Sequence, residues 1–361
     1  MAQYEASEEQ LKALVGEDSG LSKQTQDAVL ALIGTGAAVA ATEASQSGTD
    51  NFNVGLVSQK GGTEFNDATY TKVQTAVFDE GAKGEVNLTN NDGITTEIVK
   101  ADGLEVNMGS GDNSVTIDGG QASVNTGDGE DTFNIQGAFK GDLNSGGGDD
   151  EFVLDTDAQN NAEVSVDAGD GFDLMRLIGK AIQHQFEFSG GKFHMKSANI
   201  TLDGVDVVAT DENNDGKYEH ITVLANDNQD SLAAKLYMVA FGREAIDDGK
   251  DPYDKGNTLA GIKFWMDQDA RDDFGQAFLN CDEFHNKYDK VDNKAYVNSL
   301  FENLGLNNAD LQSELLTKLE NGQLDRYEVA ITLAESDQAV KLLGNDGIKY
   351  VIDSDNVDFS A

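Results

Sequence analysis

The sequence has little basic charge, a single cysteine and no long apolar run. Each of these shortages excludes a class of partner or structure. Among its 361 residues, 25 are Lys or Arg and 66 are Asp or Glu, which gives a formal net charge of −41. Such a chain lacks the basic surface that nucleic acids and anionic lipids require. Because Cys281 is alone, it has no partner for an internal disulfide. The apolar stretch from 28 to 41 is too short and too interrupted by glycine to insert in a membrane.

Sequence motifs of catalysis are also missing. The chain has no G-x-S-x-G, no Walker loop, no H-E-x-x-H and no C-x-x-C, and its four histidines are scattered. Its glycine-rich turns carry acids that would repel a pyrophosphate, and no helix follows them, which argues against a dinucleotide site. We therefore expect a protein that is not an enzyme.

What the chain does contain is a turn of glycine and acid that recurs four times. Each copy reads G-x-G-x-[D/N]-x-apolar, and the copies begin at residues 109, 127, 146 and 169, that is, 18, 19 and 23 residues apart. Glycine admits positive φ and lets backbone carbonyls crowd around a hard cation, while the acid supplies an anionic oxygen. Each turn is therefore predicted to form half of a calcium site, and an 18-residue period would stack each turn above the previous one.

The predicted calcium ligands are the turn glycines, whose backbone carbonyls would point at the ion, and the acids or amide beside them. In chain order they are Gly109, Gly111, Asp112, Asn113, Gly127, Asp128, Gly129, Asp131, Gly146, Gly148, Asp149, Asp150, Gly169, Asp170, Gly171 and Asp173.

These turns resemble the RTX nonapeptide G-G-x-G-x-D-x-U-x, over residues 104 to 177. The resemblance implies a right-handed parallel β-roll, a form of β-solenoid, that folds around several calcium ions. The sequence departs from that pattern at Asn113, where the repeat has Asp, and the intervening half-turns near Gly119 and Gly137 lack the acid. We therefore expect one edge of the roll to carry ions. The alternative is a calcium-free solenoid in which Gly and Asp only form turns.

The rest of the chain suggests a multidomain protein of β plus α class. Residues 1–50 are predicted to form a small helical segment with a second helix capped by Ser22, followed by a small-residue loop. Residues 51–225 form the roll, whose later strands, from about 185 to 209, continue and cap it without calcium glycines. Residues 226–345 have helical periodicity and a faint internal duplication, which predicts an α-helical bundle.

A second candidate metal site lies at the end of the roll. Asp211, Asn213, Asp215 and Glu219 occupy alternate or later positions of a D-x-N-x-D-G loop, as in the looser calcium loops of surface proteins. A plain hairpin turn at residues 214–216 would need no metal.

The helical part resembles a domain of unassigned function that often accompanies RTX repeats in secreted and surface-layer proteins. The acidic tail 346–361 resembles an uncleaved secretion signal, although a frayed terminus would look similar. We therefore expect an extracellular or cell-surface protein that is exported without an N-terminal signal peptide. Halophilic adaptation would also explain part of the acidity.

The leading hypothesis is a calcium-dependent structural protein that assembles with itself into a surface-layer-like lattice, a filament or a biofilm matrix. A cell-surface polysaccharide is a further candidate partner. The alternative is a calcium-dependent adhesin whose helical domain binds glycan or protein.

Overall fold

The structure is a computed structural model. It describes residues 12, 21–33, 40–41, 47–50, 56–59, 64–71, 73–78, 80–90, 92–156, 162–179, 186–195, 199–212, 220–224, 228–243, 260–266, 274–339 and 348–351. Internal contacts divide the chain into two units, one of residues 1–205 with 210–214 and the other of residues 206–209 with 215–361.

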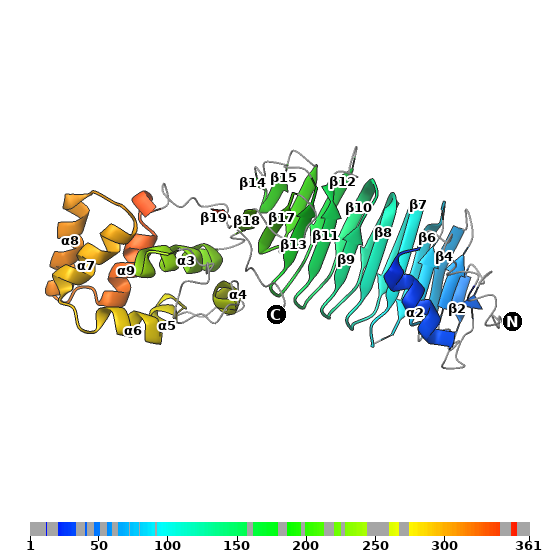
Figure 1. The fold of residues 1–361 in the computed structure, drawn as a ribbon, viewed down its shortest axis with the longest axis horizontal. Helices are drawn as coiled ribbons and strands as arrows, with labels where there is room; N and C mark the ends of the chain where they lie inside the picture. The colour runs from blue at the N-terminus through cyan, green and yellow to red at the C-terminus, as the bar shows by residue number, and fades with distance from the viewer. Residues whose placement is uncertain are drawn as a thin grey trace. The chain divides into compact units, whose positions relative to one another are not determined.

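The first unit is a parallel β-solenoid, with about six turns over residues 64–178. Its strands pair side by side in two parallel ladders, and Figure 1 shows the successive coils in order along the unit. The first ladder comprises β1 (Ala40–Ala41), β3 (Leu56–Gln59), β5 (Thr75–Phe78), the first halves of β7 (Thr95–Met108) and β8 (Ser114–Asn125), β9 (Thr132–Ile135), β11 (Glu151–Asp155) and β13 (Leu174–Ile178). The second comprises β2 (Ser47–Asp50), β4 (Glu64–Thr71), β6 (Lys83–Thr89), the second halves of β7 and β8, β10 (Phe139–Asn144), β12 (Glu163–Asp167) and β16 (Ile200–Asp203).

Apolar side chains fill the interior of the coils in straight columns. In the second ladder, Val106, Val124, Leu143, Val166 and Leu202 are paired in register and are at most 1% exposed. The alternation that the sequence shows places every second residue inside, because neighbouring side chains of a strand point to opposite faces. Burial of each such side chain stabilises the folded state by roughly 1.5–3 kcal/mol, so the apolar core alone favours the stacking of the coils.

The predicted parallel solenoid is confirmed, but its two ends differ from expectation. Among the described residues, strand pairing begins at Ala40, inside the segment predicted to be a loop. At the other end, β14 (Phe186–Ser189) and β15 (Lys192–Met195) form an antiparallel hairpin, so the prediction that they continue the coil is wrong. Gly190 and Gly191 have φ of 64° and 82°, and two positive φ values in a two-residue loop turn the chain straight back.

Helix α2 (Lys23–Ile33) packs on the outer face of the solenoid beside β5 and β7 (Figure 1). Its predicted N-cap is confirmed, since the Ser22 hydroxyl accepts a hydrogen bond from the Thr25 backbone N–H at 3.2 Å. The Ser22 N–H and hydroxyl in turn donate to the carboxylate of Glu97, which is 2% exposed. Ser7 to Val15 are also predicted to form a helix; of these residues the structure describes only Lys12, which is helical.

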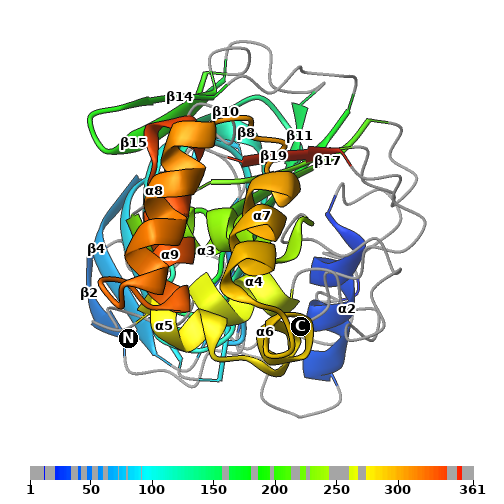
Figure 2. The ribbon, with the colours of Figure 1, turned by 90° about the vertical axis from the view of Figure 1, so that its left-hand side faces the viewer.

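The second unit is mainly helical, with α7, α8 and α9 running side by side in Figure 2. Its elements are β17 (Val207–Asp211), which spans the boundary of the units, β18 (His220–Val223), α3 (Asn228–Leu236), the π-helix η2 (Tyr237–Phe241), α4 (Ala260–Met266), α5 (Phe274–Leu279), α6 (Asp282–Tyr288), α7 (Asn293–Asn303), α8 (Ala309–Glu320), α9 (Arg326–Ala334) and β19 (Ile348–Val351).

Two details of this unit were not predicted. The chain breaks at Cys281, which is extended with φ −91° and ψ 161°, so α5 and α6 are two separate helices. Residues 348–351, predicted as part of a secretion-signal-like tail, form β19 and pair antiparallel with β18, while the rest of that tail lies outside the described residues. None of the described helices is long and apolar enough to cross a membrane.

Candidate cation ladder

The four predicted turns lie on one edge of the solenoid, where the second ladder ends and the first begins. Backbone hydrogen bonds tie each turn to the next: Gly111 N–H donates to the Asp128 carbonyl at 2.7 Å, Gly129 N–H to the Gly147 carbonyl at 2.7 Å, and Gly148 N–H to the Asp170 carbonyl at 2.8 Å. The prediction that the turns stack in register is therefore confirmed.

The close stacking requires glycine. Gly148 has φ of 131°, and a Cβ added there would lie 2.0 Å from the Gly129 carbonyl oxygen of the preceding coil. At Gly171, with φ of 138°, the added Cβ would lie 1.8 Å from the Gly148 carbonyl oxygen. Any larger residue would push the coils apart, so these glycines bring the carbonyls of neighbouring turns close together.

The acids of the turns separate into an inner and an outer set. The inner set, together with Asn113 one coil earlier, is buried: Asn113 is 2% exposed, Asp131 1%, Asp150 2% and Asp173 0%. The outer set is solvated, with Asp112, Asp128 and Asp170 exposed and Asp149 half-buried. Two outer carboxylates support the backbone of the next coil, since Asp112 Oδ1 accepts from Glu130 N–H and Asp149 Oδ1 from Phe172 N–H, both at 3.0 Å.

We call the buried column of Asn113, Asp131, Asp150 and Asp173 the inner ladder. In each member, Oδ1 accepts a hydrogen bond from the backbone N–H one coil earlier. The bonds run from Ile94 to Asn113 (3.0 Å), Asn113 to Asp131 (2.7 Å), Asp131 to Asp150 (2.7 Å) and Asp150 to Asp173 (2.9 Å). One oxygen of each side chain is thereby fixed in the same orientation throughout.

The second carboxylate oxygen is different. Oδ2 of Asp131 and Oδ2 of Asp150 are buried, and neither has a hydrogen-bond partner among the described residues. The hydroxyls of Thr126 and Ser145 lie nearby but donate to carbonyls of the next coil, Thr126 to Ser145 at 3.4 Å and Ser145 to Ala168 at 2.8 Å. A buried anionic oxygen without a donor is costly, so these two atoms call for a proton or a cation.

The pKa values of Asp131 and Asp150 also indicate that their charged forms lack sufficient stabilisation. Burial, assisted by repulsion from neighbouring acids, raises the pKa of Asp150 to about 6 and raises that of Asp131 as well. The nearby hydroxyl dipoles of Thr126 and Ser145, and the hydrogen bonds from backbone N–H groups, lower both pKa values only in part. With neighbouring coils ~4.8 Å apart, two ionised ladder acids repel each other by about 3 kcal/mol at an effective dielectric constant of 20.

The carboxylates of this ladder are stacked one per coil rather than gathered into a cluster. Within the described ranges, no group of three or more His, Cys, Asp or Glu side chains is placed to hold a metal ion. A cation between coils would therefore take most of its oxygens from the glycine-turn carbonyls, which are hard ligands suited to calcium. The residues present fit such an ion because they combine buried, undonated carboxylate oxygens with closely stacked carbonyls.

The second predicted metal loop is described only at its start. Asp211 is 3% exposed at the end of β17. Asn213, Asp215 and Glu219 lie outside the described residues.

Sequence reasoning did not separate the inner from the outer acids, and it missed the hydroxyl column of Thr126 and Ser145. Both hydroxyl residues immediately precede the first glycine of a turn and are 0% exposed. That position was the available signal: a small hydroxyl residue before the first glycine in two consecutive copies.

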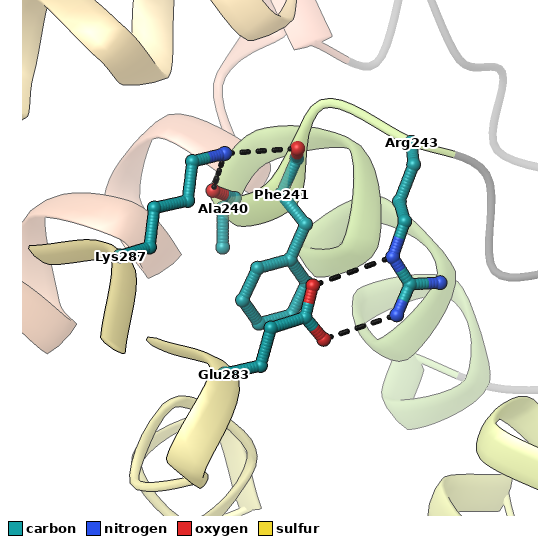
Figure 3. A network of polar contacts seen from close by, with 5 residues as sticks. All are labelled: Ala240, Phe241, Arg243, Glu283 and Lys287. Carbon is teal, nitrogen blue, oxygen red and sulfur yellow. Dashed lines mark hydrogen bonds and ion pairs between the residues drawn. The ribbon is translucent and has the colours of Figure 1, made fainter. Parts of the chain in front are cut away.

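In the helical unit, charged side chains of α6 pair with groups at the end of η2 and just after it (Figure 3). Arg243 binds the Glu283 carboxylate through two nitrogens at 3.4 and 3.0 Å, and Lys287 Nζ donates to the carbonyls of Ala240 and Phe241 at 3.1 and 2.9 Å. These contacts satisfy the carbonyls at the end of the π-helix η2. Burial lowers the pKa of Lys287, with partial compensation by Glu283.

Comparison with known proteins adds one finding. A family model described as a domain of unknown function, DUF4214, matches residues 275–343, which run from α5 past α9. No curated protein and no solved structure matches the chain.

Proposed function

We propose that this chain is a calcium-dependent structural protein whose solenoid is completed by cations between its coils, and that it assembles with itself outside the cell into a lattice, filament or matrix. The observation that carries the proposal is the pair of buried oxygens, Asp131 Oδ2 and Asp150 Oδ2, that have no hydrogen-bond donor among the described residues. An ion between coils would neutralise them and would join one coil to the next.

The proposed mechanism is a folding switch. Where free calcium is scarce, the inner-ladder acids repel each other and the strongly acidic chain resists compaction. At roughly millimolar calcium, the ions stabilise only the folded coils, so binding energy becomes folding energy. Exposed turn acids such as Asp112, Asp128 and Asp170 would be available to bridge neighbouring molecules through further ions.

Circular dichroism with chelator, calcium or magnesium tests the switch. We expect the β-signal to fall in chelator and to return with calcium but not with magnesium, because magnesium sheds its water shell reluctantly and demands a regular octahedron of ligands. Identical spectra under all three conditions would refute the calcium requirement.

Light scattering and negative-stain microscopy, during the same calcium titration, test assembly. Sheets or fibres that appear with calcium support the structural role. A protein that folds with calcium but stays monomeric contradicts self-assembly and favours the adhesin alternative.

A further inference from the structure

Asn113 interrupts the charge of the inner ladder but not its geometry. Its Oδ1 accepts the Ile94 N–H, as each ladder Asp accepts the N–H one coil earlier, and this bond fixes which end of the amide is nitrogen. The side chain of Asn has the same shape as that of Asp. Asn113 Nδ2 therefore occupies the position that Oδ2 occupies in Asp131 and Asp150.

Four oxygens converge on that nitrogen. Asn113 Nδ2 lies 3.1 Å from the Gly109 carbonyl oxygen, 2.6 Å from that of Gly111, 3.1 Å from that of Thr126 and 3.0 Å from Asp131 Oδ1. An amide nitrogen carries two hydrogens, so four acceptors exceed its capacity to donate. A cage of oxygens around the partly positive hydrogens of one NH₂ group is the arrangement that a hard cation prefers.

The register of the coils places equivalent oxygens at the next two steps. The Asn125–Asn144 and Asn144–Asp167 pairs make Ser145 and then Ala168 the counterparts of Thr126. By analogy with Asn113, we infer that Asp131 Oδ2 faces the carbonyls of residues 127, 129 and 145 and Asp150 Oδ1. Likewise, Asp150 Oδ2 would face the carbonyls of residues 146, 148 and 168 and Asp173 Oδ1. There, an acceptor oxygen replaces the donor nitrogen, so acceptors face acceptors.

We propose that the Asn113 amide group takes the place of the first cation and ends the row of ions, so that ions occupy only the steps from Asp131 to Asp150 and from Asp150 to Asp173. The amide would hold the first step together permanently, with or without calcium. The coils before Asn113 would then stay folded in chelator and serve as a template for the calcium-dependent coils. This inference rests on the proposed calcium function but makes a separate claim about where the ions begin.

Native mass spectrometry of the full chain in calcium chloride tests the claim by the difference in bound ions from wild type. Asn113→Asp should gain one calcium ion, because an anionic oxygen then replaces the donor nitrogen within the cage. Asp131→Asn should lose one ion, because the new amide extends the donor column by one coil. As a matched control, Ser110→Asp adds the same charge at an exposed position of the same turn and should leave the count unchanged.

The outcomes separate the two proposals. If wild type binds no calcium, the proposed function and this inference both fail. If wild type binds calcium but Asn113→Asp gains no ion relative to Ser110→Asp, the inference alone is overturned. Should Asn113→Asp fail to fold, Asp131→Asn decides: an unchanged ion count contradicts the inference, and a loss of one ion supports it.

Discussion

The solenoid and the helical unit bury polar groups in different ways. In the solenoid, Asp131 and Asp150 each bury a carboxylate oxygen that lacks a donor among the described residues. In the helical unit, Tyr296 donates its buried hydroxyl to the Arg326 carbonyl at 2.6 Å, and the Arg326 guanidinium donates to the carbonyls of Tyr288 and Val291, both at 2.6 Å. The comparison teaches that a stacked repeat places like groups beside like groups, whereas a helical bundle can bring complementary groups together.

Removal of divalent cations should produce the largest difference in stability between the solenoid and the helical unit. At neutral pH in chelator, we expect backbone amides of residues 114–178 to exchange hydrogen at least about a hundredfold faster, because the ladder loses its neutralising charge. Amides of α7, α8 and α9 should keep their protection. Hydrogen exchange with mass spectrometry measures both regions in one sample, and equal loss of protection in the two would contradict the distinction.

Alanine substitution at glycine should produce the next largest difference in stability between the two units. Gly148→Ala would place a Cβ 2.0 Å from the Gly129 carbonyl oxygen, so we expect the calcium-loaded solenoid to lose more than about 3 kcal/mol. The matched control is Gly322→Ala in the helical unit, where φ is 68° but nothing lies within 4 Å of the added Cβ. There the cost should be about 1–2 kcal/mol from backbone strain alone. Denaturant melts of both variants would show this ranking, and similar losses would contradict it.

The stability of the metal-free solenoid should depend on pH, and this effect should be no larger than that of Gly148→Ala. Because the pKa of Asp150 rises from 3.8 unfolded to about 6 folded, its contribution favours the solenoid fully below pH 4 and disappears as pH rises through 6. That shift corresponds to about 3 kcal/mol, and the raised pKa of Asp131 adds in the same direction.

Thermal melts in chelator between pH 4 and 7.5 test this expectation. The solenoid should melt at higher temperature toward acid, and saturating calcium should remove most of the difference, because ion and proton compete for the same oxygens. A metal-free solenoid that is most stable at pH 7.5 would contradict the buried-acid account.

The smallest effect is expected at an ion pair of the helical unit. Glu283→Gln removes the negative charge from the ion pair between Glu283 and Arg243. The Glu283 side chain is 23% exposed and the Arg243 side chain 27%. We expect a loss of at most about 1 kcal/mol in the helical unit, with no change in the calcium midpoint of the solenoid. A shifted calcium midpoint, measured by circular dichroism, would show that the two regions are energetically coupled.

Much of the solenoid could be predicted from local signals. Alternating apolar residues such as Val106, Val124 and Leu143 predict strands, and the repeated glycine turns predict their stacking period. The hairpin of β14 and β15 could not be told from another coil by alternation, because strands of either direction alternate alike. Only the two consecutive glycines, Gly190 and Gly191, marked the reversal.

The sequence alone determined that this chain forms parallel coils with glycine-rich, acidic turns on a common edge, because strand periodicity and turn chemistry are local properties. The tertiary structure decided which acids are buried. Asp131 and Asp150 face the closed interior of the turn, while Asp112 and Asp128 face water, although all four lie in similar G-x-G contexts. The reason is physical: burial depends on what the neighbouring coil covers, and that coil lies about 19 residues away in the chain but within hydrogen-bond distance in space.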